Sequence, residues 1–511
     1  MVAHVTSLVK DKKTTIENLR REVFGPTIEK KQEVKKAAAA EKESLNSDQP
    51  QEKSKDQSKN KPKKPGHGRN GVEKYSGANR IKVEHEALKH GDCCRKCASG
   101  KVYRQNEPKQ LVRLVGQAPI GANVYELERF RCGTCGAIDT AKSPEGIGDE
   151  KYDAATASTL ALLKYGSGTP MNRIETLQAD MGIPLPASTQ WEILDEAAIK
   201  AEPVANELCH QAAQGDVVYN DDTTMRVRSL KTKDNATEEP SDTKKTMRTG
   251  VFTSGIVSTT EGGNTIALYF TGRQHAGENL AAVLSARASG LESPIQMCDA
   301  LSRNMPESLK TIVSNCLIHA RREFVKAEPH FPAECEFVLE CLGKVYQVDA
   351  RAKGLKLSAK DRLLLHRQDS QVHMDQLKAW CEQKFANKEV EPNSRLGQAI
   401  NYLTKHWERL TLFLRQPGAP LDNNLCERVL KKAILHRKNA LFYETERGAR
   451  VGDIFMSLIH TAEHAKINVF KYLTAIIKNF DIAKTNPSQW MPWNYEANLL
   501  QMTAARAVAE A

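Results

Sequence analysis

The sequence predicts an α/β protein in which several structural units share one long chain. Three observations support this fold class. The chain has 511 residues, which is too long for one ordinary hydrophobic core. In the middle of the chain apolar residues alternate with a period of two, as they do in strands. On both sides of that region they recur every three to four residues, which is typical of helices.

The N-terminal part of the chain is basic. Residues 1–36 are predicted to form an amphipathic helix, or alternatively a short dimerising coiled coil. Residues 37–87 are predicted to be a disordered linker, because their Lys, Gln, Ser and Pro bury too little apolar surface to fold. The first 80 residues carry +8 of the net charge of +11. Such an arm indicates an anionic partner, most simply nucleic acid, or else a solvated tail.

Two cysteine pairs in the segment 88–148 have the spacing of zinc ligands. The pairs are Cys94 with Cys97 and Cys132 with Cys135. Together they supply the four thiolates of a tetrahedral structural Zn²⁺ site, and Cys93 is an alternative to Cys94. The segment is therefore predicted to be a zinc-binding module.

Neither a secretory signal nor a run of roughly 20 apolar residues is found. We therefore expect a cytoplasmic protein without a membrane partner, whose cysteines bind metal and do not form disulfides.

Residues 149–212 are predicted to be a helical DNA-binding region resembling a helix-turn-helix. One helix ends near Met181, a short turn follows, and a second helix begins with Ser188 or Thr189 as its cap. In such a motif the second helix enters the major groove. Any helical hairpin gives the same pattern, so DNA reading and simple packing both stay open.

Two aspartates end two of the four strands that are predicted next. The strands are 215–227, 248–259, 264–272 and 294–300, with a helix before the last. This is the order of a ribonuclease H-like core, in which the first and fourth strands are neighbours. Asp221 and Asp299 could then meet. Two close carboxylates repel each other, and Mg²⁺, which prefers oxygen ligands, relieves that repulsion.

A third acidic residue, Glu427, lies on a predicted amphipathic helix that Asp422 or Asn423 would cap. Taken alone, Glu427 is better explained as the surface partner of Lys431, a contact of roughly 0.2–0.5 kcal/mol. The alternative is a metal ligand beside basic groups that bind phosphate, which include Lys438.

The stretch DNNLCERVLKKAILHRKNALF, which contains Glu427, resembles the C-terminal signature of the bacterial insertion-sequence-66 transposases. The segments REVFGPTIEK, PGHGRNG, NDDTTMRV, CDAL, CLIHARREF and SLIHTAEHAKINVFKYL agree with this family in the same order. The resemblance implies a DDE transposase with Asp221, Asp299 and Glu427 as catalytic acids. The alignment selects Asp221, since Asp222 stands where the family usually has glutamate, and a strand lets only one of the two face Asp299.

The resemblance also implies cofactors and partners. The three acids would hold two Mg²⁺ ions, for which Mn²⁺ can substitute. The DNA-binding residues would be Lys431, Arg437 and Lys438, with Arg321 and Arg322 as further candidates that could also be a solvated basic face. The protein would act on element ends and target DNA as a homo-oligomer, with small accessory proteins, at the bacterial nucleoid.

The predicted core would span residues 213–305 and 415–480. The long interval between Asp299 and Glu427 has helical periodicity, so residues 306–414 are predicted to be a helical insertion. Residues 481–511 would be a C-terminal tail. Two other functions fit the sequence: a catalytically inactive zinc-containing DNA-binding regulator, and a structure-selective nuclease that cuts without joining.

Overall fold

The computed structural model describes residues 89–93, 101–103, 116–131, 138–142, 144, 150–230, 250–306 and 309–509. The chain divides into two units, Met1–Leu114 and Val115–Ala511. In the first unit, Cys93 and Lys101 form an isolated antiparallel bridge. The predicted N-terminal helix, the basic linker and the predicted zinc ligands Cys94, Cys97, Cys132 and Cys135 lie outside the described residues. The sheet and the helices around it belong to the second unit.

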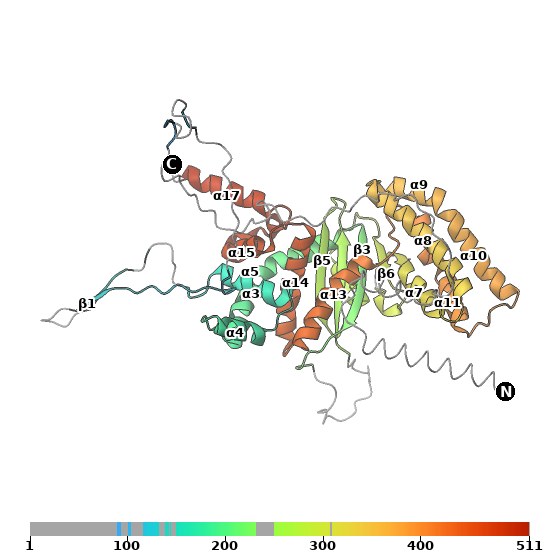
Figure 1. Cartoon of the computed structure of the whole chain (residues 1–511), viewed down its shortest axis with the longest axis horizontal. Coiled ribbons are helices and arrows are strands. Elements are labelled where there is room, and N and C mark those ends of the chain that lie inside the picture. Colours follow the sequence, from blue (N-terminus) through green and yellow to red (C-terminus); the bar gives the residue numbers. More distant parts are fainter. Residues whose placement is uncertain are drawn as a thin grey trace, which may run out of the picture. The chain divides into compact units, whose positions relative to one another are not determined.

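A five-stranded mixed sheet forms the centre of this unit (Figure 1). Its strands are β3 (Val217–Thr224), β4 (Phe252–Thr259), β5 (Thr265–Gly272), β6 (Ile295–Cys298) and β7 (Ile312–Asn315). The order across the sheet is β5-β4-β3-β6-β7. The first three strands are antiparallel to one another, whereas β3, β6 and β7 are parallel. The chain is therefore an α/β protein, as the sequence predicts.

Strand β7 differs from the sequence prediction, which places it in the helical segment 306–414. Its sequence, Ile-Val-Ser-Asn, does not alternate between apolar and polar residues, so the period of two that marks a half-buried strand is absent. The other four strands lie within the predicted ranges. A separate ribbon pairs β1 (Arg129–Arg131) with β2 (Ile138–Thr140).

Helices surround the sheet. They are α3 (Ala154–Ala161), α4 (Met171–Asp180), α5 (Ala187–Ala213), α6 (Ala276–Leu284), α7 (Leu317–Ala327), α8 (Pro332–Gly354), α9 (Ala359–Asp369), α10 (Gln371–Ala386), α11 (Arg395–Lys405), α12 (Trp407–Leu410), α13 (Asn424–Ala440), α14 (Glu446–His464), α15 (Val469–Lys478), α16 (Phe480–Thr485) and α17 (Tyr495–Ala509). Among the described helices, none is both long and apolar enough to cross a lipid bilayer.

Helices α13 and α6 pack on opposite faces of the sheet. A Cβ atom added to Gly255 of β4 would lie 3.0 Å from Leu430 of α13. The preceding residue, Ser254, faces α6, where Asn279 Nδ2 donates to Ser254 Oγ at 2.9 Å. Because successive side chains of a strand alternate between faces, each residue of the central strands can be assigned to the α13 face or the α6 face.

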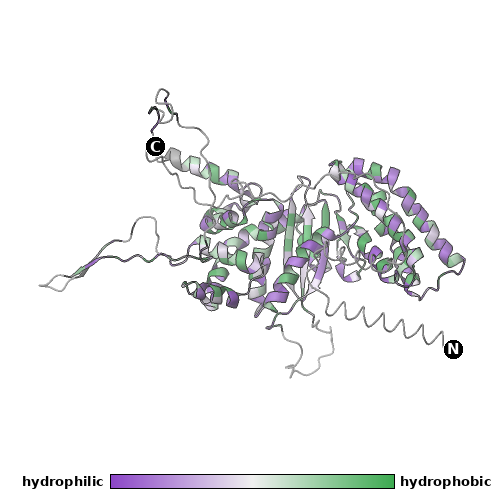
Figure 2. Cartoon of the chain, viewed as in Figure 1, coloured by the Kyte–Doolittle hydropathy of each residue, from purple (hydrophilic) through white to green (hydrophobic). Residues whose placement is uncertain are grey.

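Buried apolar residues form two cores. One joins the sheet to α3, α5, α13, α14 and α15. The other is built mainly by α7, α8, α10 and α11. Figure 2 shows green hydrophobic residues in the strands, while α8, α9 and α10 carry purple and green along their length. The helices that follow β7 therefore have a core of their own.

Residues 481–509, within the predicted C-terminal tail, are largely helical. They include part of α16, a 3₁₀ turn (Pro487–Trp490) and α17. Trp490 is completely buried, and Tyr472 Oη donates to its carbonyl oxygen at 3.0 Å. A buried tryptophan therefore anchors this segment to the rest of the unit.

Helix α14 satisfies the outer edge of β5, which has no strand beside it. Unpaired edge amides otherwise invite pairing with another chain. Four helical residues rise about 6 Å and two strand residues about 6.6 Å. Every fourth side chain of α14 can therefore reach every second amide of β5. The amides of Ala267, Tyr269 and Thr271 donate to the side chains of Thr461, Ser457 and Asp453 at 3.0, 3.0 and 2.7 Å.

Asp453 is the acidic member of this row. It is 5% exposed, and its other oxygen accepts a bond from Thr271 Oγ1 at 2.8 Å. Burial raises the pKa of Asp453 to about 7 because a low-dielectric environment disfavours the charged carboxylate.

We expect Asp453→Asn to become more stable relative to wild type as the pH rises. The folded-state pKa lies above the ordinary value of 3.8, so the wild type loses stability from about pH 4 to about pH 7, while asparagine does not ionise. Thermal unfolding at pH 5 and pH 8 measures this: Tm of the variant minus Tm of the wild type should be larger at pH 8. Asp481→Asn, at an exposed position, is the control. The same Tm difference at both pH values would contradict the raised pKa.

Candidate active site

Strands β3 and β6 bring Asp221 and Asp299 together. The two strands are parallel neighbours, with Tyr219 opposite Met297. Asp221 and Asp299 each follow two residues later, at the same end of the sheet. Burial raises the pKa of Asp221 to about 7, and the nearby charge of Asp299 adds to this effect. The two carboxylates therefore form one electrostatic unit.

Asp222 belongs to the other face of the sheet. Its side chain is 1% exposed and lies 2.9 Å from Nδ1 of His275 and 3.3 Å from Nη2 of Arg303. Asp221, by contrast, is opposite Gly255 in the β3–β4 register, and Gly255 faces α13. Only Asp221 therefore shares a face with the helix that carries Glu427.

The start of α13 is fixed by Asp422 and Asn423 in different ways. Asn423 occupies the N-cap position without a capping bond from its side chain, while Asp422 Oδ1 accepts a bond from the amide of the first helical residue, Asn424, at 3.0 Å. Asn423 is completely buried. Its Nδ2 donates to the Asn220 carbonyl in β3 at 3.2 Å, and its amide donates to Cys316 Sγ at 3.3 Å. Asn423 thus ties the helix that carries Glu427 to the strand that carries Asp221.

Glu427 is held by basic groups of α7 and not by Lys431. Arg322 Nη2 donates to both carboxylate oxygens, at 3.0 and 3.2 Å, and His319 Nε2 lies 3.9 Å away. The Glu427 side chain is 17% exposed. Within the described residues, no ion pair joins Glu427 to Lys431, so the predicted surface pair is not formed. The explanation is tertiary: α7 supplies a guanidinium that binds both oxygens.

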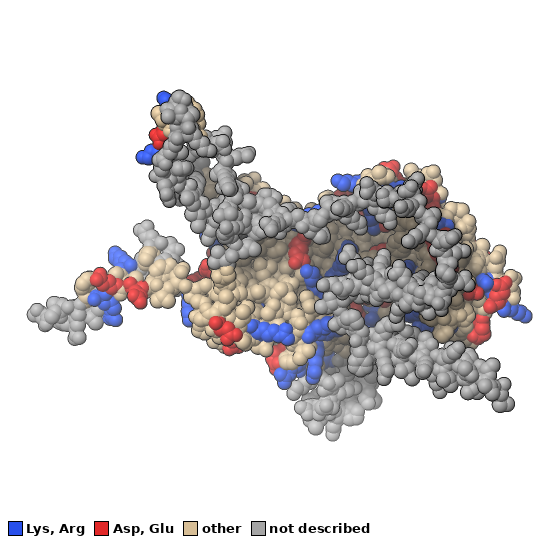
Figure 3. Space-filling view, viewed as in Figure 1, with Lys and Arg blue, Asp and Glu red and all other residues tan. Residues whose placement is uncertain are grey.

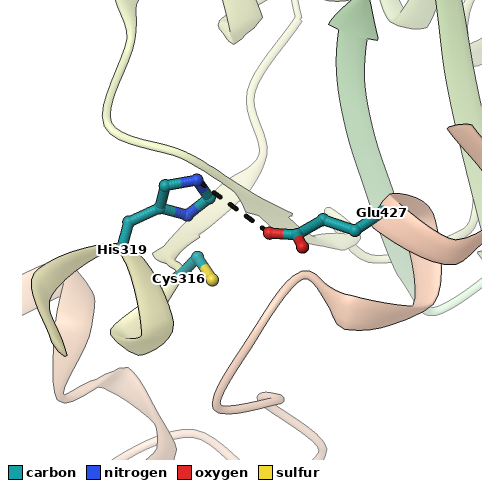
Figure 4. Close-up of side chains that lie close together, drawn as sticks. All are labelled: Cys316, His319 and Glu427. Atoms are coloured by element: carbon teal, nitrogen blue, oxygen red, sulfur yellow. Dashed lines mark ion pairs between the residues drawn. The ribbon is translucent and has the colours of Figure 1, made fainter. Parts of the chain in front are cut away.

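His319 lies beside Glu427, with its Nε2 3.9 Å from a carboxylate oxygen. Burial and the neighbouring Arg322 lower its pKa and outweigh the opposite effects of Asp299 and Glu427. Figure 4 shows the imidazole directed toward the Glu427 carboxylate.

Cys316, His319 and Glu427 place one ligand atom each within 4.8 Å of one another. A thiolate, an imidazole and a carboxylate can hold zinc. The Cys316 sulfur also accepts a bond from the Asn423 amide at 3.3 Å, and burial raises the pKa of its thiol to about 11. Among the described residues, Asp221, Asp299 and Glu427 do not form such a group within 4.8 Å, although carboxylate oxygens are the ligands that Mg²⁺ or Mn²⁺ prefers.

Buried amides connect the strand ends beneath the acids. Gln296 Nε2 donates to Asn220 Oδ1 at 2.8 Å, and both side chains donate to the Asn304 carbonyl, at 2.7 and 2.8 Å. Asn304 Nδ2 in turn donates to Asp299 Oδ1. The sequence analysis missed these residues. Their only signal is an amide side chain inside or beside an otherwise apolar strand.

The predicted DNA-binding residues have different environments. Lys431, Lys438 and Arg321 are exposed. Arg437 donates to the hydroxyls of Thr223 and Thr224, at 3.2 and 2.6 Å, and so fastens the end of α13 to β3. On the face seen in Figure 3, basic side chains (blue) lie among acidic ones (red), and no single large basic area stands out among the described residues.

Helices α4 and α5 occupy the predicted helix-turn-helix. Helix α5 begins after Pro186, without a side-chain cap, so the predicted cap by Ser188 or Thr189 is wrong: proline already holds the extended backbone before the first turn. The exposed side of α5 is acidic, and its Asp195 and Glu202 form ion pairs with α14. DNA reading by this helix stays a prediction.

A mixed sheet with carboxylates at the ends of adjacent parallel strands places the chain among α/β proteins with an acidic site at a strand end. The sequence model of the transposase IS66 family matches residues 151–451. The chain belongs to this family, which confirms the resemblance seen in its motifs, and transposases are DNA-processing enzymes.

Three proteins of Sinorhizobium fredii are similar to this chain. The uncharacterised protein y4hP is 22% identical over 81% of this chain and 76% of its own length. The uncharacterised protein y4jD is 30% identical over 37% of each chain. The uncharacterised protein y4qI is 21% identical over 67% of this chain and 62% of its own.

We expect Asn423→Ala to lower the free energy of unfolding by about 1–3 kcal/mol, because a buried carbonyl of β3 loses its donor. Asn424→Ala is the matched control, since the Asn424 side chain makes no hydrogen bond to the part of the chain that the structure describes. Urea unfolding measures both variants. Equal losses would show that Asn423 is not the link between α13 and β3.

Proposed function

We propose that the chain is a DDE transposase whose ribonuclease H-like core holds two Mg²⁺ ions, or Mn²⁺, on Asp221, Asp299 and Glu427. One observation carries this proposal. Asp221 lies in β3 two residues beyond its pairing with β6, Asp299 directly follows β6, and the two interact electrostatically. Asp221 also shares its face of the sheet with α13, the helix of Glu427.

The strand order supports the ribonuclease H-like assignment. The three antiparallel strands β3, β4 and β5 are followed by α6 and then by β6 and β7, which are parallel to β3. Strand β3 is the central strand of the sheet. The fourth strand then lies beside the first, as the assignment requires.

The donor set supports the choice of metal. Asp221 and Asp299 repel each other in a partly buried place, so a divalent cation would relieve a cost that the fold already bears. Such ions, when bound, activate the attacking oxygen and stabilise the leaving one. The three acids would hold the ions by their carboxylates, and Lys431 and Lys438 would attract the phosphates of the strand.

The proposed reaction has two steps. Water first attacks a phosphodiester at the end of the element's terminal inverted repeat, and the bond to the 3′ oxygen breaks and leaves a 3′-hydroxyl. That hydroxyl next attacks a phosphodiester of the target, so one P–O bond forms and another breaks. No external energy source is needed. The first step hydrolyses a phosphodiester bond, and the second replaces one phosphodiester bond by another.

Several parts of the proposal concern DNA and assembly. Arg321, Arg322 and Arg437 are further candidates for phosphate contacts, and Arg322 would have to leave Glu427 when a cation binds there. We also propose that the α4–α5 region and the basic arm help bind the element ends. Action as a homo-oligomer, small accessory proteins and a place at the nucleoid belong to the same proposal.

We expect Asp221→Asn, Asp299→Asn and Glu427→Gln each to abolish Mg²⁺-dependent cleavage of a labelled element end while end binding persists. Each change removes a charged metal ligand but keeps the shape of the side chain. Asp481→Asn, at an exposed position of α16, is the control and should still cleave. If Glu427→Gln cleaves at the wild-type rate, the assignment of the third acid is wrong.

A target plasmid in the same reaction separates the candidate functions. A transposase joins the cleaved end to the plasmid, a nuclease cuts without joining, and an inactive regulator binds without doing either. Joined product that depends on all three acids is the expected result.

We further propose that Cys94, Cys97, Cys132 and Cys135 hold one structural Zn²⁺. Metal analysis of the purified chain should find roughly one zinc per chain, and replacing Cys97 and Cys135 by serine should remove it, because thiolate ligands are lost. A folded, metal-free wild-type protein that still binds element ends would refute this site.

A further inference from the structure

We propose that Asn304 is a positioning residue that holds Asp221 and Asp299 together as one metal-binding pair. This inference rests on the proposed function, because it concerns the same acids. No sequence motif singled Asn304 out. The evidence is its contacts, its burial and the way that its loop is fixed.

The side-chain amide of Asn304 reaches both aspartates. Its Nδ2 donates to Asp299 Oδ1, and its side chain also forms a hydrogen bond with Asp221. Asn304 Oδ1 is buried and has no partner among the described residues. An NH₂ group carries two hydrogens, so a single amide can donate to both carboxylates at once.

The backbone of Asn304 is fixed to the two strands that carry the acids. Its carbonyl accepts bonds from Asn220, which precedes Asp221, and from Gln296 of β6. All three side chains are completely buried. The residue that bridges the carboxylates is therefore positioned relative to both of their strands, and not merely attached to a loop.

Helix α6 holds the same loop from the other side. A Cβ atom at Gly277 would lie 2.4 Å from the Met305 carbonyl oxygen and 2.8 Å from that of Arg303, so only glycine permits this close approach. Arg303 also pairs with Asp222 at 3.3 Å. The loop between Leu301 and Met305 therefore has little freedom to move away from the acids.

The arrangement leaves ligand positions open. Asp299 Oδ1 accepts bonds from Asn304 Nδ2 and from the Leu301 amide, whereas its Oδ2 has no hydrogen-bond partner in the described part of the chain. Asn304 therefore orients the Asp299 carboxylate and leaves its second oxygen available to a divalent cation.

Asn315 provides a matched control. It is equally buried, with 1% exposure against 0% for Asn304, and it also lies beside Asp299. However, its Nδ2 donates to the Asp299 backbone carbonyl at 3.3 Å and not to the carboxylate. Comparing alanine at the two positions separates an effect on the carboxylates from the general cost of removing a buried amide.

The experiment measures binding of Mn²⁺ alone to the full-length protein, by titration calorimetry or by electron paramagnetic resonance. Asn304→Ala should weaken Mn²⁺ binding by about 10-fold, within the range for lost outer-shell partners. It should also lower the cleavage rate at saturating Mn²⁺ without changing the Kd for the element end. Asn315→Ala should change Mn²⁺ affinity less than about 2-fold.

Asn304→Ser gives a graded test if the alanine variant does not fold. A hydroxyl has one hydrogen and can serve one carboxylate at a time, so we expect an intermediate loss of Mn²⁺ affinity. Wild-type affinity in both the serine and the alanine variant, or equal losses for Asn304→Ala and Asn315→Ala, would overturn the inference.

Asp299→Asn distinguishes the two levels of the argument. If Asp299→Asn does not weaken Mn²⁺ binding, the proposed metal site itself fails. If Asp299→Asn weakens binding while Asn304→Ala behaves as Asn315→Ala does, the metal site stands and only the role of Asn304 is lost.

Discussion

The parallel pairing of β3 with β6 is the constraint on which the candidate site depends. It places Asp221 beside Asp299 at one end of the sheet. Burial and the charge of Asp299 together raise the pKa of Asp221. The surrounding parts respond to this cost. Asn304 donates to the pair from below, α7 brings His319 toward it, and α13 places Glu427 on the same face. The two carboxylates repel each other, but the backbone that carries them is held firmly, because the buried amides of Asn220 and Gln296 connect the two strands.

Much of the fold could be predicted from the sequence, because strands and amphipathic helices leave periodic patterns. Four strands and the acids at their ends follow from alternation, and the family follows from the motif around Glu427. The partner of Glu427 could not be predicted. A helical wheel considers only neighbours in sequence and suggested Lys431, whereas Arg322 comes from a helix more than a hundred positions away. The residues of β7 do not alternate between apolar and polar. Asn304 could not be singled out either, because its contact with Asp299 exists only in the folded chain.

The two asparagines that precede Glu427 show how one motif can combine structure and chemistry. The completely buried Asn423 connects helix α13 to strand β3 by a hydrogen bond. Glu427, four residues later, faces the site. The buried Cys316 belongs to the same junction, since its sulfur accepts the Asn423 amide. Cys316, a member of the candidate metal cluster, therefore also joins the start of α7 to the start of α13. The motif thus combines residues that connect elements of the fold with an acid that faces the site.

The row of α14 side chains along β5 limits how the protein can assemble. With the amides of Ala267, Tyr269 and Thr271 already bonded within the chain, another polypeptide finds no donors there for continuing the sheet. At this edge a second polypeptide would therefore meet the side chains of α14 and not a row of free backbone amides.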